Sequence, residues 1–276
     1  MNLYRPLPFD TFDRVVDTSH LRSALGERIG EINSLISSFS AHKSLETSDY
    51  QRIYFYHVRK TAGTAIAYAF YRLGGDPYSI EEQLKYFTFA SRSGYRFVGV
   101  NRHLIESGRY YFATSHMPKY ELDLPRDGTF DFTVLRDPVE RVLSLYRYLA
   151  NPLADSSYAT GAFDHEYIWA ADGFQTFLDR VPRQHLLNQL YMFSRTGDID
   201  EAAEALDSIS FVIRTESLSQ DILTLEHHLG LHLELRFERE SKHAPELSDQ
   251  EMERLQEMAA PEYEMIDRLR ADSGVD

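Results

Sequence analysis

The stretch RIYFYHVRKTAGTAIAYAF, residues 52–70, decides the fold. Its first seven residues, Arg52 to Val58, are rich in β-branched and aromatic side chains, a composition typical of a buried strand. A short polar segment follows, and then residues 65–75, AIAYAFYRLGG, show helical spacing that stops at two glycines. The sequence therefore predicts a strand, a tight loop and a helix in that order.

The loop of this unit has the composition of an anion-binding site. A loop that joins a buried strand to a helix presents backbone N–H groups and the positive end of the helix dipole. Gly63 permits close backbone approach, Lys60 supplies a positive charge, and Thr61 and Thr64 add hydroxyl donors. The lysine precedes the glycine, so the Walker order is absent, which disfavours a P-loop NTPase. We predict an anion-binding loop made of Arg59, Lys60, Thr61, Ala62, Gly63, Thr64 and Ala65.

Outward from this unit, strands and helices keep alternating. Further strands are predicted at 109–116, 130–137, 210–215 and, more weakly, 233–238; helices are predicted at 138–151, 173–192, 199–208, 217–229 and 249–270. Residues 152–167 are small and polar, which indicates a loop. This order predicts an α/β protein with a P-loop-like parallel sheet flanked by helices.

The first fifty residues are expected to form a separate piece. Residues 19–37 have helical apolar spacing, which favours a packing helix, with a lid or self-association as the alternative. We therefore predict an amino-terminal helical extension at 1–50 and a main domain at 51–276. The sequence leaves a homodimer open.

Composition limits the function. The chain of 276 residues has no cysteine, which excludes disulfides and thiolate chemistry. Its 29 Lys and Arg against 43 Asp and Glu give a net charge of −14, which repels nucleic acids at long range. No long apolar run and no basic, apolar leader is present, so we expect a cytoplasmic protein without membrane association.

The segment FYHVRKTAGTAIAYAF, residues 55–70, resembles the 5′-phosphosulfate loop of sulfotransferases that use 3′-phosphoadenosine 5′-phosphosulfate (PAPS), especially heparan sulfate 2-O-sulfotransferase and its bacterial relatives. The resemblance implies the sulfotransferase fold and a catalytic Lys60 that stabilises the leaving phosphate. Those enzymes usually read HVPKTAGT, so Arg59 replaces a proline. This arginine either adds an anion contact or points to solvent.

A second segment, FTVLRDPVERVLSLYRY at 132–148, resembles the element with which the family binds the cofactor's 3′-phosphate. The matching positions are Arg136 and Ser144. An arginine fork binds phosphate through two hydrogen bonds, and a serine two helical turns on lies near the same face. Arg136 alone would equally fit a structural ion pair, so the prediction depends on both motifs occurring in the right order.

Between the two motifs lies TSHMP, residues 114–118, at the end of a predicted strand. In the resembling glycan enzymes a histidine here removes the acceptor's proton, which implies that His116 is the catalytic base. As one of 11 histidines it would otherwise be considered structural. His57 is predicted to pack inside the sheet, and His227 and His228 to be surface or packing residues, so no metal is expected.

Two later positions extend the resemblance. SFVIRTESLSQDILTL, residues 210–225, resembles the family's late strand and helix, which implies that Arg214 stacks on adenine or contacts a phosphate. Residues Glu240 to His243 resemble the family's basic loop over the 3′-phosphate, which implies that Lys242 contacts this phosphate. A solvent-exposed lysine with no ligand contact is an equally good interpretation of Lys242.

These features predict transfer of the sulfuryl group of PAPS to a hydroxyl or amine, with adenosine 3′,5′-bisphosphate as the product. The negative net charge favours a neutral or cationic small-molecule acceptor, such as a natural product, over an anionic glycan. A carbohydrate O-sulfotransferase remains the alternative, followed by an ATP-dependent P-loop kinase and a non-catalytic nucleotide-binding protein.

Overall fold

The computed structural model describes residues 50–150, 166–236 and 247–272. The chain divides into two units, Met1–His42 and Lys43–Asp276, and every described residue belongs to the second. The predicted helix at 19–37, the predicted loop up to residue 165, and Lys242 lie outside the described residues. The predicted domain boundary at residue 50 stays a prediction.

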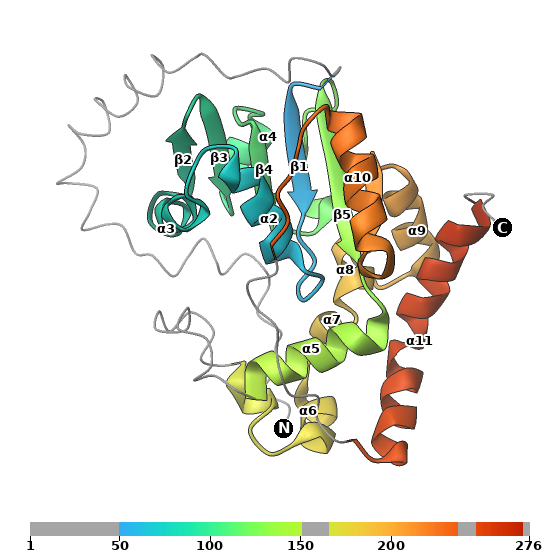
Figure 1. Cartoon of the computed structure of the whole chain (residues 1–276). Helices are drawn as coiled ribbons and strands as arrows, with labels where there is room; N and C mark the ends of the chain where they lie inside the picture. Colours follow the sequence, from blue (N-terminus) through green and yellow to red (C-terminus); the bar gives the residue numbers. More distant parts are fainter. Residues whose placement is uncertain (1–49, 151–165, 237–246, 273–276) are drawn as a thin grey trace. The chain divides into compact units, whose positions relative to one another are not determined.

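A six-stranded sheet forms the centre of the second unit (Figure 1). The strands are β1 (Arg52–Tyr56), β2 (Phe89–Arg92), β3 (Tyr95–Gly99), β4 (Phe112–Ser115), β5 (Thr129–Leu135) and β6 (Phe211–Arg214). Their order in the sheet is β2-β3-β4-β1-β5-β6. All neighbours are parallel except β2 and β3, which form an antiparallel hairpin. The predicted α/β fold with a central parallel sheet is confirmed.

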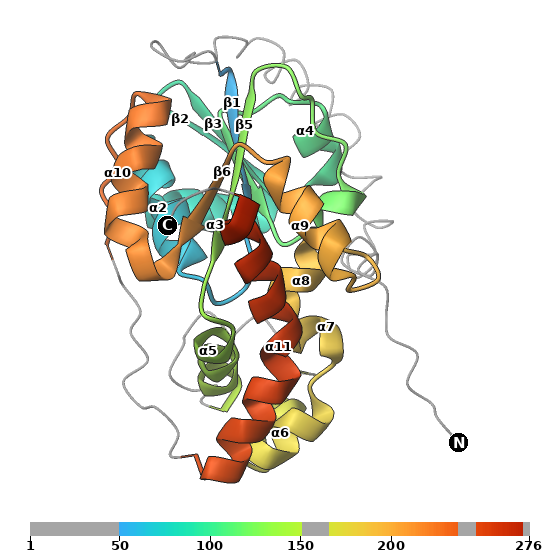
Figure 2. The same ribbon diagram turned by 90° about the vertical axis from the view of Figure 1, so that its right-hand side faces the viewer.

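Helices cover both faces of this sheet. They are α2 (Gly63–Arg72), α3 (Pro77–Phe87), α4 (Arg102–Glu106), α5 (Pro138–Ala150), α6 (Phe174–Arg180), α7 (Arg183–Leu186), α8 (Asn188–Phe193), α9 (Ile199–Asp207), α10 (Leu218–Leu229) and α11 (Asp249–Asp272). Figure 2 shows α2, α3 and α10 on one side of the sheet and α4 and α9 on the other.

Alternation along β1 explains the two layers, because successive side chains of a strand point to opposite faces. Ile53 and Phe55 belong to a core cluster with α2, α3 and α10. Tyr54 and Tyr56 belong to a second cluster that includes residues of α5 to α9 and α11. Each face of the strand is therefore buried against its own set of helices.

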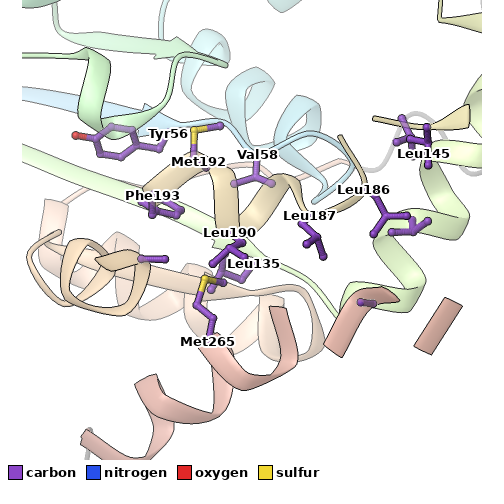
Figure 3. Close-up of a cluster of buried hydrophobic side chains, with 14 of the residues drawn as sticks. Tyr56, Val58, Leu135, Leu145, Leu186, Leu187, Leu190, Met192, Phe193 and Met265 are labelled. Atoms are coloured by element: carbon purple, nitrogen blue, oxygen red, sulfur yellow. The ribbon is translucent and has the colours of Figure 1, made fainter. Parts of the chain in front are cut away.

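Part of the second cluster lies next to the ends of β1 and β5 (Figure 3). Tyr56 at the end of β1, Val58 two residues later and Leu135 at the end of β5 lie among apolar side chains of α7, α8 and α11. The labelled side chains from these helices and from the residue between α7 and α8 are Leu186, Leu187, Leu190, Met192, Phe193 and Met265. This packing supports the loops that follow both strands.

Two sequence predictions were wrong in this part of the chain. The helical pattern at 173–192 forms three short helices, α6 to α8, because Pro182 and the non-helical backbone of Leu187 interrupt it. Residues 233–236 form no strand. Instead, the backbone N–H of Leu233 donates to the Glu226 carboxylate at 2.5 Å. The Leu233 side chain packs in the core cluster that contains Ile53 and Phe55.

No helix within residues 50–150, 166–236 and 247–272 is long and apolar enough to cross a bilayer.

Candidate functional site

The predicted site residues follow the carboxyl ends of adjacent strands. The loop after β1 carries Lys60, and β4 and β5, which flank β1, lead into His116 and Arg136. Arg214 ends β6, where it pairs in register with Leu135 of β5. Since parallel strands bring their carboxyl ends to one edge, the fold places four separate sequence motifs along the same edge.

The loop after β1 has an unusual backbone. Lys60 and Ala62 both have left-handed conformations, with φ values of 69° and 63°. Ala62 also precedes α2 without a side-chain cap. Among the described residues, the backbone N–H groups of Thr61, Ala62, Gly63 and Thr64 have no acceptor. Alternating left-handed residues at a helix N-terminus make a concave set of N–H donors, which fits an anionic group.

The hydroxyl of Thr61 has a different role from the one expected. It is fully buried and donates to the carbonyl oxygen of Val58 at 2.9 Å. Thr61 therefore uses its hydroxyl proton to fix the shape of the loop, which leaves its backbone N–H for a ligand.

His57 lies against this loop and not inside the sheet, so the prediction for this residue was wrong. Strand β1 ends at Tyr56, and His57 is half-buried just beyond it. A Cβ atom on Gly63 would lie 2.0 Å from His57 Nε2, so the imidazole occupies the space beside the glycine. Burial, together with the nearby His116, Lys60 and Arg59, holds the pKa of His57 well below its usual value. His57 is therefore neutral.

His116 is oriented by the backbone of His57. Its Nδ1 lies 2.5 Å from the His57 carbonyl oxygen, and the two imidazole centroids are 4.4 Å apart. A carbonyl oxygen only accepts hydrogen bonds, so Nδ1 carries the proton and Nε2 keeps its lone pair. The ring reaches solvent on one side, but the protein around it removes much of its hydration. This burial and the positive Arg59 lower the pKa of His116 to about 4.

Arg59 does not point to solvent, and its contact with an anion stays a prediction. Its guanidinium forms a two-bond ion pair with Glu166, at 2.7 and 3.0 Å. The two side chains are only 16% and 5% exposed. The backbone N–H of Arg59 donates to Asn188 Oδ1 at 3.1 Å. A proline, which lacks this N–H, would be unable to make that bond.

Arg136 and Lys60 are brought together at the edge of the sheet. Arg136 Nη1 lies 3.5 Å from the carbonyl oxygen of Lys60, and Nη2 lies 3.2 Å from Glu140 Oε2. The Lys60 ammonium lies 4.2 Å from the centre of the Tyr148 ring. Glu140, Ser144 and Tyr148 follow one another at intervals of four residues, so they share one face of α5. Ser144 therefore lies on the helix face that meets both Arg136 and Lys60.

Arg214 is connected to the Arg136 segment through Glu216. Arg214 Nε lies 3.6 Å from Glu216 Oε2, and the other carboxylate oxygen accepts the backbone N–H of Asp137 at 2.6 Å. This places Arg214 at the same edge as the other motif residues, with its guanidinium partly buried. Adenine stacking and phosphate contact both remain predictions for it.

Within the described parts of the chain, no three His, Asp or Glu side chains gather closely enough to hold a metal ion. The expectation that the reaction needs no metal stays a prediction.

Sequence reasoning missed the residues that support the site from a distance. Asn188 and Gln189 hold the backbone of Arg59 and Arg136, and Glu166 pairs with Arg59. The one available signal was the pair of polar residues inside the apolar run LLNQLYMF, residues 186–193. Nothing in that run indicates which loops the two side chains reach.

Comparison with known proteins identifies the family. A model of the sulfotransferase family matches residues 43–265. The chain belongs to the sulfotransferase family. The match contains every described site residue, and the protein is a sulfotransferase enzyme.

Among solved structures, this sulfotransferase is similar to mouse sulfotransferase SULT7A1 complexed with PAP, at 15% identity and a TM-score of 0.36, over 78% of this chain and 67% of that one. It is also similar to a sulfotransferase from Alicyclobacillus acidocaldarius, at 16% identity and a TM-score of 0.37, over 81% of this chain and 96% of that one. No curated protein matches the sequence.

Proposed function

We propose that this sulfotransferase transfers the sulfuryl group of PAPS to a hydroxyl or amine of a small neutral or cationic acceptor, such as a natural product, and releases adenosine 3′,5′-bisphosphate. The observation that carries the proposal is the 3.5 Å approach of Arg136 Nη1 to the carbonyl oxygen of Lys60. It brings two anion-binding elements, from different strands, to one edge of the sheet.

The donor groups present fit a nucleotide with anions at both ends. Four backbone N–H groups, from Thr61 to Thr64, have no acceptor in the described part of the chain and suit the 5′-phosphosulfate. The Arg136 fork and the half-buried Ser144 hydroxyl suit the 3′-phosphate. Arg136 would exchange part of its contact with Glu140 for the phosphate.

The residues of the site then have distinct tasks. When bound, PAPS supplies an activated sulfuryl group. His116 accepts the acceptor's proton at Nε2, because Nδ1 is held by the His57 carbonyl. Lys60 leaves the Tyr148 ring and, with the loop N–H groups, stabilises negative charge on the departing phosphate oxygen. Arg136 and Ser144 hold the far end of the nucleotide in line.

His116→Ala tests the assignment of the base. We expect kcat to fall by about 10²- to 10⁴-fold, since the acceptor loses its proton acceptor, while the affinity for adenosine 3′,5′-bisphosphate stays within about twofold. Initial rates and calorimetric titration measure the two quantities. His103→Ala, an exposed histidine on α4, is the control and should change neither. Near-normal turnover in the His116 variant would exclude it as the base.

The net charge of the chain bears on the class of acceptor. The net charge of −14 opposes a polyanionic chain, whereas a neutral or cationic molecule meets no such barrier. Turnover is therefore expected with uncharged or amine-bearing hydroxyl compounds. Turnover confined to anionic oligosaccharides would favour the carbohydrate O-sulfotransferase alternative. Location in the cytoplasm and the oligomeric state stay predictions.

Nucleotide preference tests the proposal as a whole. Calorimetric titration should give tighter binding of adenosine 3′,5′-bisphosphate than of AMP, ADP or ATP. Arg136→Ala should remove that preference, because it deletes the group that pairs with the 3′-phosphate. Equal or tighter binding of ATP would overturn the proposal and favour a kinase.

A further inference from the structure

Neighbouring side chains of one short helix hold both anion-binding elements. Asn188, the first residue of α8, accepts the backbone N–H of Arg59 through Oδ1 at 3.1 Å. Gln189, the next residue, accepts the N–H of Arg136 through Oε1 at 2.8 Å. Its Nε2 donates back to the Arg136 carbonyl oxygen at 3.0 Å. The loop that carries Lys60 is thus bonded to Asn188, and the segment that carries Arg136 is bonded to the next residue of the same helix.

The contacts of Gln189 permit one orientation of its amide. Nε2 donates both to the Arg136 carbonyl and to Glu262 Oε2, the latter at 2.9 Å, while Oε1 accepts from an N–H group. Turning the amide over would place its oxygen against two other acceptors. Gln189 is fully buried, so water is not available to replace a lost bond. The Gln189 amide therefore bonds both the backbone N–H and the backbone carbonyl of Arg136.

Glu262 fixes the position of Gln189. Its carboxylate accepts the backbone N–H groups of Gln189 and Leu190 at 2.7 and 3.3 Å, and lies 3.5 Å from Arg141 Nε. Glu262 and Arg141 are both completely buried. Burying such a pair costs desolvation energy that the ion pair regains only in part, so the pair is weak evidence for stability. What it does provide is a fixed connection of α8 to α5, which carries Arg141, and to α11, which carries Glu262.

We propose that Asn188, Gln189 and Glu262 form a positioning unit that sets the separation between the 5′-phosphosulfate loop and the Arg136 guanidinium, and thereby selects nucleotides that carry both a 5′- and a 3′-phosphate. The inference rests on the proposed function. Gln189 acts through Arg136. Because Gln189 bonds both the backbone N–H and the carbonyl of Arg136, the Cα atom from which the arginine side chain extends has a fixed position. Small displacements of a positioning contact weaken binding strongly, because a two-bond guanidinium–phosphate geometry tolerates little error.

Titration of adenosine 3′,5′-bisphosphate and of AMP into the full-length protein tests this role. The wild type should prefer the bisphosphate. Gln189→Ala should weaken bisphosphate binding roughly tenfold or more and AMP binding less than about twofold, because only the first nucleotide uses Arg136. Asn188→Ala acts on the 5′ loop, so it should weaken both nucleotides by a similar factor.

Ser194→Ala is the matched control. Ser194 is also fully buried next to α8, and it bonds Glu201 and the Asp198 N–H instead of either loop. Its replacement should lower the melting temperature and leave the ratio of the two affinities unchanged. Gln189→Met, which keeps the side chain's length without its amide, replaces the alanine variant if that variant fails to fold.

The results separate the two proposals. A wild type without preference for the bisphosphate contradicts the proposed function. A wild type with that preference, combined with Gln189 variants that keep it or that lose both nucleotides equally, overturns the positioning role while leaving the proposed function intact.

Discussion

At the scale of single residues, the neighbours of His116 decide its chemistry. The His57 carbonyl fixes which ring nitrogen carries the proton, and Arg59 favours the neutral ring. Arg59 is itself held by Glu166. A positive charge close to a histidine disfavours protonation, so the proposed base is kept in its neutral form.

The pH dependence of kcat/KM follows from this arrangement. As the proposed base, His116 acts in its neutral form, and its pKa of about 4 lies below the ordinary value near 6.5. We therefore expect activity to be lost only as the pH falls well below 6.5, with a level profile from about pH 6 to 8. Because the unfolded chain takes up this proton first, folding stability should also fall as the pH drops from 6.5 towards 4.

Arg59→Met tests the cause of the lowered pKa. The change removes a positive charge and leaves Glu166 unpaired, and both effects raise the pKa of His116. The pH at which kcat/KM falls on the acid side of its profile, its acid limb, should move to a higher value. Arg72→Met, on a guanidinium that bonds the Glu234 carbonyl, should leave the limb in place. A wild-type limb at or above pH 6.5 would contradict the assignment.

At the scale of elements, the strand–loop–helix unit depends on Gly63 for a reason additional to ligand approach. The imidazole of His57 occupies the place of a Cβ atom, and the ring is itself stacked on Phe55 at 5.1 Å between centroids. The backbone of His57 is also fixed, since its N–H bonds the Ser115 carbonyl. The ring has little freedom to move away, so position 63 has no room for a larger residue.

Gly63→Ala should therefore destabilise the protein by about 1–3 kcal/mol through overpacking and should weaken nucleotide binding. In the double variant Gly63→Ala/His57→Ala the obstructing ring is absent. Adding Gly63→Ala to a His57→Ala protein should therefore destabilise it much less than adding Gly63→Ala to the wild type. Urea denaturation of the four proteins in this cycle measures the coupling.

Gly99→Ala is the control for this cycle. The added Cβ would lie an ordinary 3.7 Å from Leu84, so stability should change little. If the losses in the free energy of unfolding caused by Gly63→Ala and His57→Ala simply add, steric conflict between these two residues is not the reason for the glycine.

At the scale of the whole molecule, the described sheet and both described hydrophobic clusters belong to the second unit. Both hydrophobic clusters and all six strands lie between residues 50 and 269. The sulfotransferase family match begins at residue 43, where the second unit also begins. The strands and loops that carry Lys60, His116, Arg136 and Arg214 all belong to this unit.

A chain of residues 43–276 should accordingly unfold in one cooperative transition and bind adenosine 3′,5′-bisphosphate within about twofold of the full-length affinity. Thermal melting and calorimetry check this. A truncated chain that aggregates, or one that binds tenfold more weakly, would show that residues 1–42 contribute to the fold or to the nucleotide site.

Much of the fold, and with it the strand ends that carry the candidate site residues, was accessible from the sequence. Strand, loop and helix alternate in short windows, so apolar periodicity, Gly63 and Pro138 were enough to predict β1, α2, β5 and α5. The hairpin of β2 and β3 was missed, although Ser93 and Gly94, both with positive φ, form the two-residue turn that signals it.

The sequence by itself determined which chemical groups stand at the strand ends, because each motif is local to one turn of chain. Only the tertiary structure decided their partners. Arg59 meets Glu166 across 107 positions, and Gln189 meets Arg136 across 53. Such contacts depend on strand order and on how α8 packs beneath the sheet edge. No local pattern encodes that arrangement, because it results from the burial of two apolar faces at once.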